Sequence, residues 1–213
     1  MSEVEVGDGY AHLYQTGWSP ERVAQRVASL QSAGGTLENP DTGLILVGEF
    51  DDRNEPIPAE RDQLVRALEL SDRDSQFVTL WLGAPNDLWY VVRRVSPDVV
   101  VEEFGLSGFR QPEPFVHSGV VPEMTQDEVI HLVLGWMGAL GSAALGLLAD
   151  RWGSSLEIDL DDVVLGGPTP VTIRPDLLVL QPQVADRHPE LADWGRRPHG
   201  RFTAFDPTGI LDR

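Results

Sequence analysis

The chain has 213 residues, a formal net charge of −18 at pH 7 and no cysteine, and all 16 of its basic side chains are arginine. Thiolate nucleophiles, cysteine zinc sites, lysine Schiff bases and a P-loop are therefore excluded. An acidic chain repels nucleic acid, whose binding requires a basic surface. Because the first residues lack a basic and apolar leader, we expect a cytoplasmic protein that binds neither nucleic acid nor membrane.

The N-terminal third predicts two helices and a strand. Residues 1–8 are expected to be a flexible acidic tail, and residues 9–18 fit no single pattern. Ser19, followed by proline and glutamate, is a typical helix start. Residues 44–47 predict a short buried strand, and a second amphipathic helix is expected over residues 58–70.

The middle of the chain predicts an antiparallel meander followed by a loop. Three strand-like runs, at residues 77–82, 88–95 and 99–104, are separated by turn sequences that contain proline, asparagine and aspartate. Three prolines within residues 105–123 then favour a long loop.

A capping-box sequence at Thr125 begins a helix that we expect to continue to Trp152. Residues 132–149 carry no charge, and this uncharged run is long enough to span a bilayer. It contains four glycines. The scarcity of flanking basic residues favours a central core helix over a membrane span. A ligand groove along its small side chains is the third alternative. For a core helix, Gly138→Leu should destabilise the fold by overpacking.

An acidic segment and an aromatic pair are candidates for binding a partner. Residues 156–160 alternate and predict a strand whose carboxylates share one face, where they could bind a basic protein or a hard cation. A solvated face is the ordinary alternative. The candidate partner-binding residues are Glu157, Asp159, Asp161, Trp89 and Tyr90.

The C-terminal part predicts one more strand, at residues 171–180, and then an irregular segment over residues 182–213 that docks on the domain. Within it, residues 187–201 are the only locally basic stretch, which could bind an anion through guanidinium groups or use them for docking. The residues concerned are Arg187, Arg196, Arg197, Arg201 and Trp194.

Catalytic patterns are missing from the sequence. There is no GxSxG elbow, and the histidines show neither HxH nor HExxH spacing, so no metal site and no cofactor are predicted. His131 fits a core position better than that of a catalytic base. The five histidines are His12, His117, His131, His188 and His199.

Taken together, the sequence predicts an α+β domain over residues 9–181, in which a mainly antiparallel sheet packs around a long glycine-containing helix and two shorter amphipathic helices. The function expected is that of an acidic binding protein, such as an immunity-type inhibitor of a basic protein toxin. A hydrolase or metal-dependent enzyme built on histidine and carboxylates is one alternative. A chaperone or adaptor that docks a partner helix is the other.

Overall fold

One antiparallel sheet runs through the residues that the computed structural model describes, which are 9–33, 35–39, 41–48, 57–60, 64, 68, 75–82, 87–106 and 124–213. Its strand order is β10-β11-β9-β8-β1-β7-β6-β5-β3-β4, and β2 also pairs with β5. The strands are β1 (Tyr10–Thr16), β2 (Gly35–Thr36), β3 (Ile45–Gly48), β4 (Ile57–Ala59), β5 (Ser75–Leu82), β6 (Asp87–Ser96), β7 (Val99–Gly105), β8 (Ala144–Asp150), β9 (Leu177–Leu180), β10 (Arg196–His199) and β11 (Phe202–Phe205).

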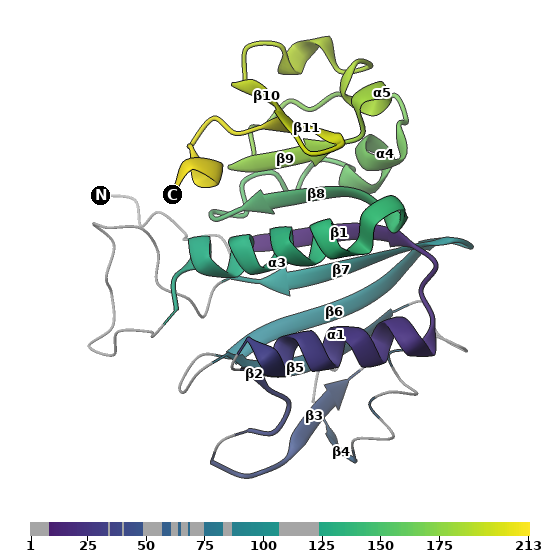
Figure 1. Cartoon of the computed structure of the whole chain (residues 1–213), viewed down its shortest axis with the longest axis vertical. Helices are drawn as coiled ribbons and strands as arrows, with labels where there is room; N and C mark the ends of the chain where they lie inside the picture. The colour runs from purple at the N-terminus through teal and green to yellow at the C-terminus, as the bar shows by residue number, and fades with distance from the viewer. Residues whose placement is uncertain are drawn as a thin grey trace.

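Helices pack on both faces of this sheet, which confirms the predicted α+β class. We call the face covered by α1 (Pro20–Ser32) and α3 (Gln126–Leu140) the helix face; Figure 1 shows both helices in front of the strands. The opposite face, here the far face, is covered in its C-terminal half by α4 (Leu160–Leu165), α5 (Pro182–Ala185) and the short helix η2 (Pro189–Leu191).

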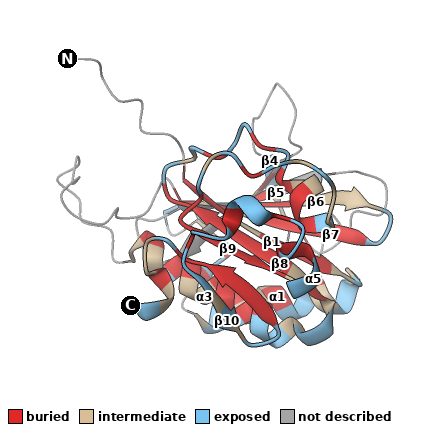
Figure 2. Cartoon of the chain, turned by 90° about the horizontal axis from the view of Figure 1, so that it is seen from above, coloured by how far each residue is buried: buried red, intermediate tan, exposed pale blue. Residues whose placement is uncertain are grey.

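A hydrophobic cluster lies on each face of the sheet. On the helix face, Val23 and Ile130 are among the helical side chains that are fully buried against the strands. On the far face, Val163 of α4 packs with Tyr14 of β1. Figure 2 shows buried residues concentrated along the strands and exposed residues on the outer sides of the helices. In the C-terminal half of the sheet, the strands are thus the middle layer between helices on both faces.

Several predicted elements are confirmed. The side chain of Ser19 caps α1 by accepting from the Arg22 amide, and the strands β5, β6 and β7 form the expected meander. The second amphipathic helix is largely outside the described residues. Of that stretch, Leu64 and Leu68 are helical and buried, whereas Pro58 belongs to β4. Residues 1–8 and 107–123, expected to be a tail and a loop, also lie outside the described residues.

The prediction of one helix from Thr125 to Trp152 is wrong in its second half. The capping box at Thr125 is present, but α3 ends at Leu140, because Gly141 has a φ of 55°. The short helix η1 (Gly141–Ala143) follows, and residues 144–150 form β8 in the middle of the sheet. A continuous apolar run does not distinguish a helix from a strand that is buried on both faces. No helix among the described residues has the length and apolarity needed to cross a membrane.

The expected overpacking at Gly138 is also corrected by the structure. Gly138 is exposed on α3, and a Cβ atom built there meets nothing within 4 Å. Because glycine in a helix interior costs about 0.5–1 kcal/mol relative to alanine, we expect Gly138→Leu to leave the free energy of unfolding unchanged or to raise it by up to about that amount. Urea denaturation of the two proteins checks this. A loss above 1 kcal/mol would show that the site is packed.

Three predictions for the C-terminal part are corrected by the structure. Residues 156–160 form turns that lead into α4, since the Asp159 carboxylate accepts from the amide of Asp162 and caps that helix. Aspartate competes well for this position, and a short alternating run cannot reveal it. The strand expected over residues 171–180 is limited to β9. The segment 182–213 is regular in its core, since β11 lies between β9 and β10 in the sheet.

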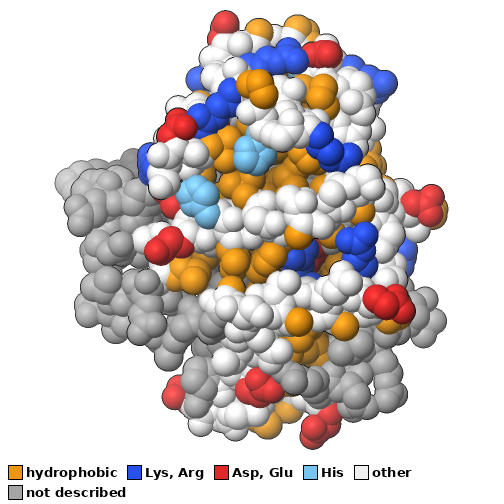
Figure 3. Space-filling view, in the orientation of Figure 1, with side chains coloured by type: hydrophobic (Ala, Val, Ile, Leu, Met, Phe, Trp, Pro, Cys, Tyr) orange, Lys and Arg blue, Asp and Glu red, His pale blue; other side chains and the backbone are white. Residues whose placement is uncertain are grey.

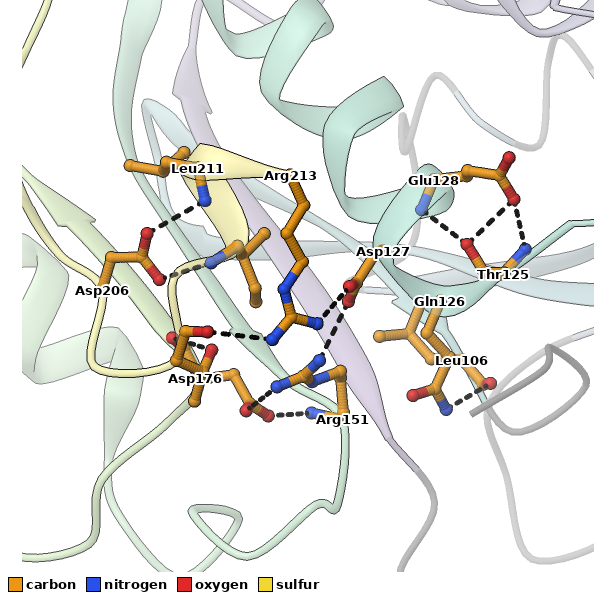
Figure 4. A network of polar contacts seen from close by, with 12 residues as sticks. Leu106, Thr125, Gln126, Asp127, Glu128, Arg151, Asp176, Asp206, Leu211 and Arg213 are labelled. Carbon is orange, nitrogen blue, oxygen red and sulfur yellow. Dashed lines mark hydrogen bonds and ion pairs between the residues drawn. The ribbon is translucent and has the colours of Figure 1, made fainter. Parts of the chain in front are cut away.

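A network of ion pairs fastens α3 to the C-terminal half of the sheet (Figure 4). Asp127, in the first turn of α3, accepts from Arg151 at 3.0 Å and from Arg213 at 2.8 Å. Arg151 also donates to Asp176 at 2.6 Å, just before β9. Because Arg151 and Asp176 are buried, these pairs are less screened than surface pairs. They fix α3 beside the C-terminal strands.

Candidate functional site

The register of the central strands places aromatic and acidic residues in rows across the far face. One row crosses four neighbouring strands. Trp89 of β6 lies beside Gly105 of β7, and Tyr10 of β1 pairs with Gly105 on one side and with Asp150 of β8 on the other. Neighbouring strands are about 4.8 Å apart, so Trp89 and Tyr10 are separated by roughly 10 Å across a glycine. A Cβ atom at Gly105 would come within 3.1 Å of Trp89 Cβ, so the glycine lets Trp89 lie close to β7.

Exposed side chains lie at both ends of this row, with Trp89 on β6 and with Leu156 and Glu157 in the turn that follows β8. The Tyr10 hydroxyl and Ser155 Oγ are 2.7 Å apart, and this contact holds the turn that presents Leu156 and Glu157. Leu156 is 61% exposed and Trp89 is 49% exposed. We call the exposed residues of this region, with the α4 cap Asp159, the far-face surface; it consists of Trp89, Leu156, Glu157 and Asp159.

Asp161, the third predicted carboxylate, is partly buried, with 26% of its side chain exposed. It accepts two hydrogen bonds from Arg93 and one from the Tyr14 hydroxyl. Burial opposes its charge, but these hydrogen bonds outweigh burial and lower the pKa of Asp161. For Glu103, which also pairs with Arg93, burial has the larger effect and raises the pKa. Asp161 therefore joins α4 to the sheet and contributes little to an open binding surface.

His12 lies on β1 between the rings of Tyr10 and Tyr14, with ring-centroid distances of 4.5 and 6.3 Å. Its Nδ1 is buried and has no hydrogen-bond partner. Burial, together with the nearby charge of Arg93, lowers the pKa of His12 to about 3. Such a histidine stays neutral over the physiological pH range and does not serve as a general base near pH 7.

The prediction that Tyr90 is a surface anchor is wrong. Its side chain is 1% exposed and points to the helix face, where its hydroxyl donates to Glu102 at 2.6 Å. Consecutive residues of a strand face opposite sides, so Trp89 and Tyr90 could not both have faced one partner. Glu102 also binds Arg26 through two hydrogen bonds of 2.6 and 2.7 Å.

The C-terminal residues contact the rest of the domain at several points. Arg187 donates to the carbonyl of Gly166. Trp194 is buried, and the guanidinium carbon of Arg174 lies 4.8 Å from the centroid of its ring. Arg201 donates to the Ala144 carbonyl. Arg196 and Arg197 form their ion pairs within the C-terminal segment itself, with Asp186 at 2.5 Å and with Asp206 and Asp212, so these two arginines do not join the segment to the rest of the domain.

The histidines do not assemble into a site in the part of the chain that the structure describes. His12, His131, His188 and His199 lie on different elements, and no group of three potential metal ligands occurs among these residues. His117 is outside the described ranges. In comparisons with known proteins, no family model, no curated protein and no solved structure matches the chain.

Sequence reasoning missed the contribution of Leu156 to the far-face surface. The assumption of a strand placed Leu156 on a buried face, whereas the turn exposes it beside Glu157. An apolar residue next to an acid, just after two serines, was the available signal for a turn.

Proposed function

We propose that this chain is an acidic binding protein whose partner is a basic protein, in the manner of an immunity-type inhibitor of a basic toxin. The far-face surface is the proposed contact. The observation that carries the proposal is the joint exposure of Trp89 and Leu156 beside Glu157 and Asp159, in a chain whose net charge is −18. Exposed aromatic residues surrounded by charged residues are typical of protein interfaces.

The acidic and the apolar residues of this surface have different roles in binding. The acidic side chains and the net charge attract a basic partner over a distance, which raises the association rate. The exposed parts of Trp89 and Leu156 lose water only in the final complex, so their burial governs dissociation. Binding should therefore weaken with salt mainly through slower association.

The alternative functions have less support in the described residues. An enzyme would need several titratable groups in one accessible cleft, whereas the low pKa of His12 keeps it neutral and its buried Nδ1 has no partner among the described residues. The adaptor hypothesis relied on a stripe of small residues along one helix. Gly146 and Ala149 of that stripe lie in β8, where Gly146 approaches the Val179 backbone.

Kinetic measurements with the partner recovered from a native lysate test the proposal. Glu157→Arg should slow association at least threefold at low salt and leave the dissociation rate within twofold of wild type. Trp89→Thr keeps a residue suited to a strand, and it should raise the dissociation rate at least tenfold. If both variants bind like the wild type, or if binding does not depend on salt, the far-face surface is not the contact.

A further inference from the structure

A hollow of about 280 Å³ opens on the helix face between the C-terminal end of α3 and the turn of the β10–β11 hairpin. Figure 3 shows hydrophobic side chains gathered in the region between α3 and the C-terminal strands, with arginine side chains around it. Its apolar lining comes from Leu134 and Met137 of α3 and from Phe202 of β11. These three side chains are buried, so they form a preformed floor.

Glycines keep the hollow open. Gly138 and Gly141 line it on the α3 side and Gly200 on the hairpin side, and a Cβ atom at any of the three would meet nothing within 4 Å. Gly141 and Gly200 have positive φ angles, so these two turns favour glycine for conformational reasons as well. A ligand can therefore approach the backbone on both sides.

Arg201 supplies a positive charge at the edge of the hollow. Its guanidinium lies 4.6 Å from the centroid of the Phe202 ring and donates to the carbonyl of Ala144. No carboxylate of the described residues lies within 4.0 Å of it, whereas the neighbouring Arg196 and Arg197 both have carboxylate partners. Guanidinium groups bind carboxylates through paired hydrogen bonds, so an organic anion suits this position.

We infer that this hollow binds a small amphipathic carboxylate. The apolar part of the ligand lies on Met137 and Phe202, and the carboxylate of the ligand binds Arg201. Pockets for drug-sized ligands begin at about 300 Å³, so a compact ligand of roughly a dozen non-hydrogen atoms fits. The net charge of −18 repels anions from the molecule as a whole. A preference for an anion over a cation must therefore arise locally.

Amide chemical shifts of the full chain, recorded during titration with decanoate below its micelle-forming concentration, test the inference. We expect the shifts to be confined to the ends of α3 and of the β10–β11 hairpin. Decanoate should bind at least tenfold more tightly than decyltrimethylammonium, and acetate should give no saturable shift. Shifts that lie elsewhere, or equal affinity for the decyl cation, would overturn the inference.

Three variants separate the two parts of the site. Arg201→Gln should lower decanoate affinity at least tenfold, and Gly138→Leu should do the same by filling the hollow. Gly135→Leu is the matched control, because Gly135 is also exposed on α3 with nothing within 4 Å but does not line the hollow. It should change the affinity less than twofold. Wild-type affinity in both Arg201→Gln and Gly138→Leu, with folding verified by their amide spectra, would contradict the assignment.

Discussion

Arg26→Met should destabilise the protein by about 3–5 kcal/mol, the usual cost of leaving a buried charge without its partner. Arg26 is 7% exposed and Glu102 is fully buried, and the guanidinium also lies 4.5 Å from the Trp136 ring. Burial disfavours the charge of Arg26, but Glu102 compensates and raises the pKa of Arg26. Without the arginine, Glu102 would keep the hydrogen bonds from Tyr90 and Gln15 as its only ones from the residues that the structure describes.

Denaturant unfolding at pH 7 measures this loss, and two further variants make it specific. The double variant Arg26→Met/Glu102→Met removes both charges, so it should recover at least half of the lost free energy of unfolding. Arg22→Met, the same change one turn earlier on α1, should alter stability by no more than about 0.5 kcal/mol. A loss below 1 kcal/mol for Arg26→Met would mean that Glu102 is not an isolated buried charge in that variant.

Lowering the pH from 7 to 5 should remove about 2 kcal/mol of stability through His12 alone. Its pKa is about 3 in the folded protein, against 6.5 for an unperturbed histidine. The stabilising effect is complete above pH 6.5, and it decreases as the pH falls toward 3, because the unfolded chain binds a proton there that the folded chain does not. At pH 5 the difference covers about 1.5 pH units at 1.36 kcal/mol each.

Comparing the wild type with His12→Phe over this pH range separates the contribution of His12 from that of the carboxylates, which titrate in both proteins. Phenylalanine can occupy the space between Tyr10 and Tyr14 without an ionisable group. We expect the stability difference between the two proteins to shift by about 2 kcal/mol from pH 7 to pH 5. His131→Gln on α3 serves as the control. Parallel stability curves for wild type and His12→Phe would show that His12 can be protonated in the folded state.

Local signals in the sequence were sufficient for elements with a clear start or a clear alternation. The cap at Ser19 and the capping box at Thr125 specify the first turns of α1 and α3 through backbone hydrogen bonds that involve only nearby residues. The same information could not reveal where α3 ends. Residues 144–150 become a strand because β1 and β9 pair with both of their edges, which is a long-range effect.

The candidate site was only partly accessible to sequence reasoning for the same reason. Glu157 and Trp89 were identified as acidic and aromatic candidates, but their position on one face of the sheet depends on the register of three strands and on the contact between Tyr10 and Ser155. Asp161 was chosen on the same grounds, yet its carboxylate is bound by Arg93, 68 residues away. Which of several acidic residues stays exposed is decided by such distant partners.

Affinity capture from a native lysate at low salt, with three immobilised proteins, tests whether the far-face surface binds a basic protein. The first is the wild type. The second carries Trp89→Thr, Glu157→Arg and Asp159→Asn, which disrupt the far-face surface while asparagine still caps α4. The third carries Asp193→Arg and Glu21→Gln, which change the net charge equally at exposed positions elsewhere. We expect a basic protein to be retained by the first and third proteins and lost from the second. Retention of the same proteins on all three, or of no basic protein on the wild type, would show that the far-face surface does not bind a basic partner.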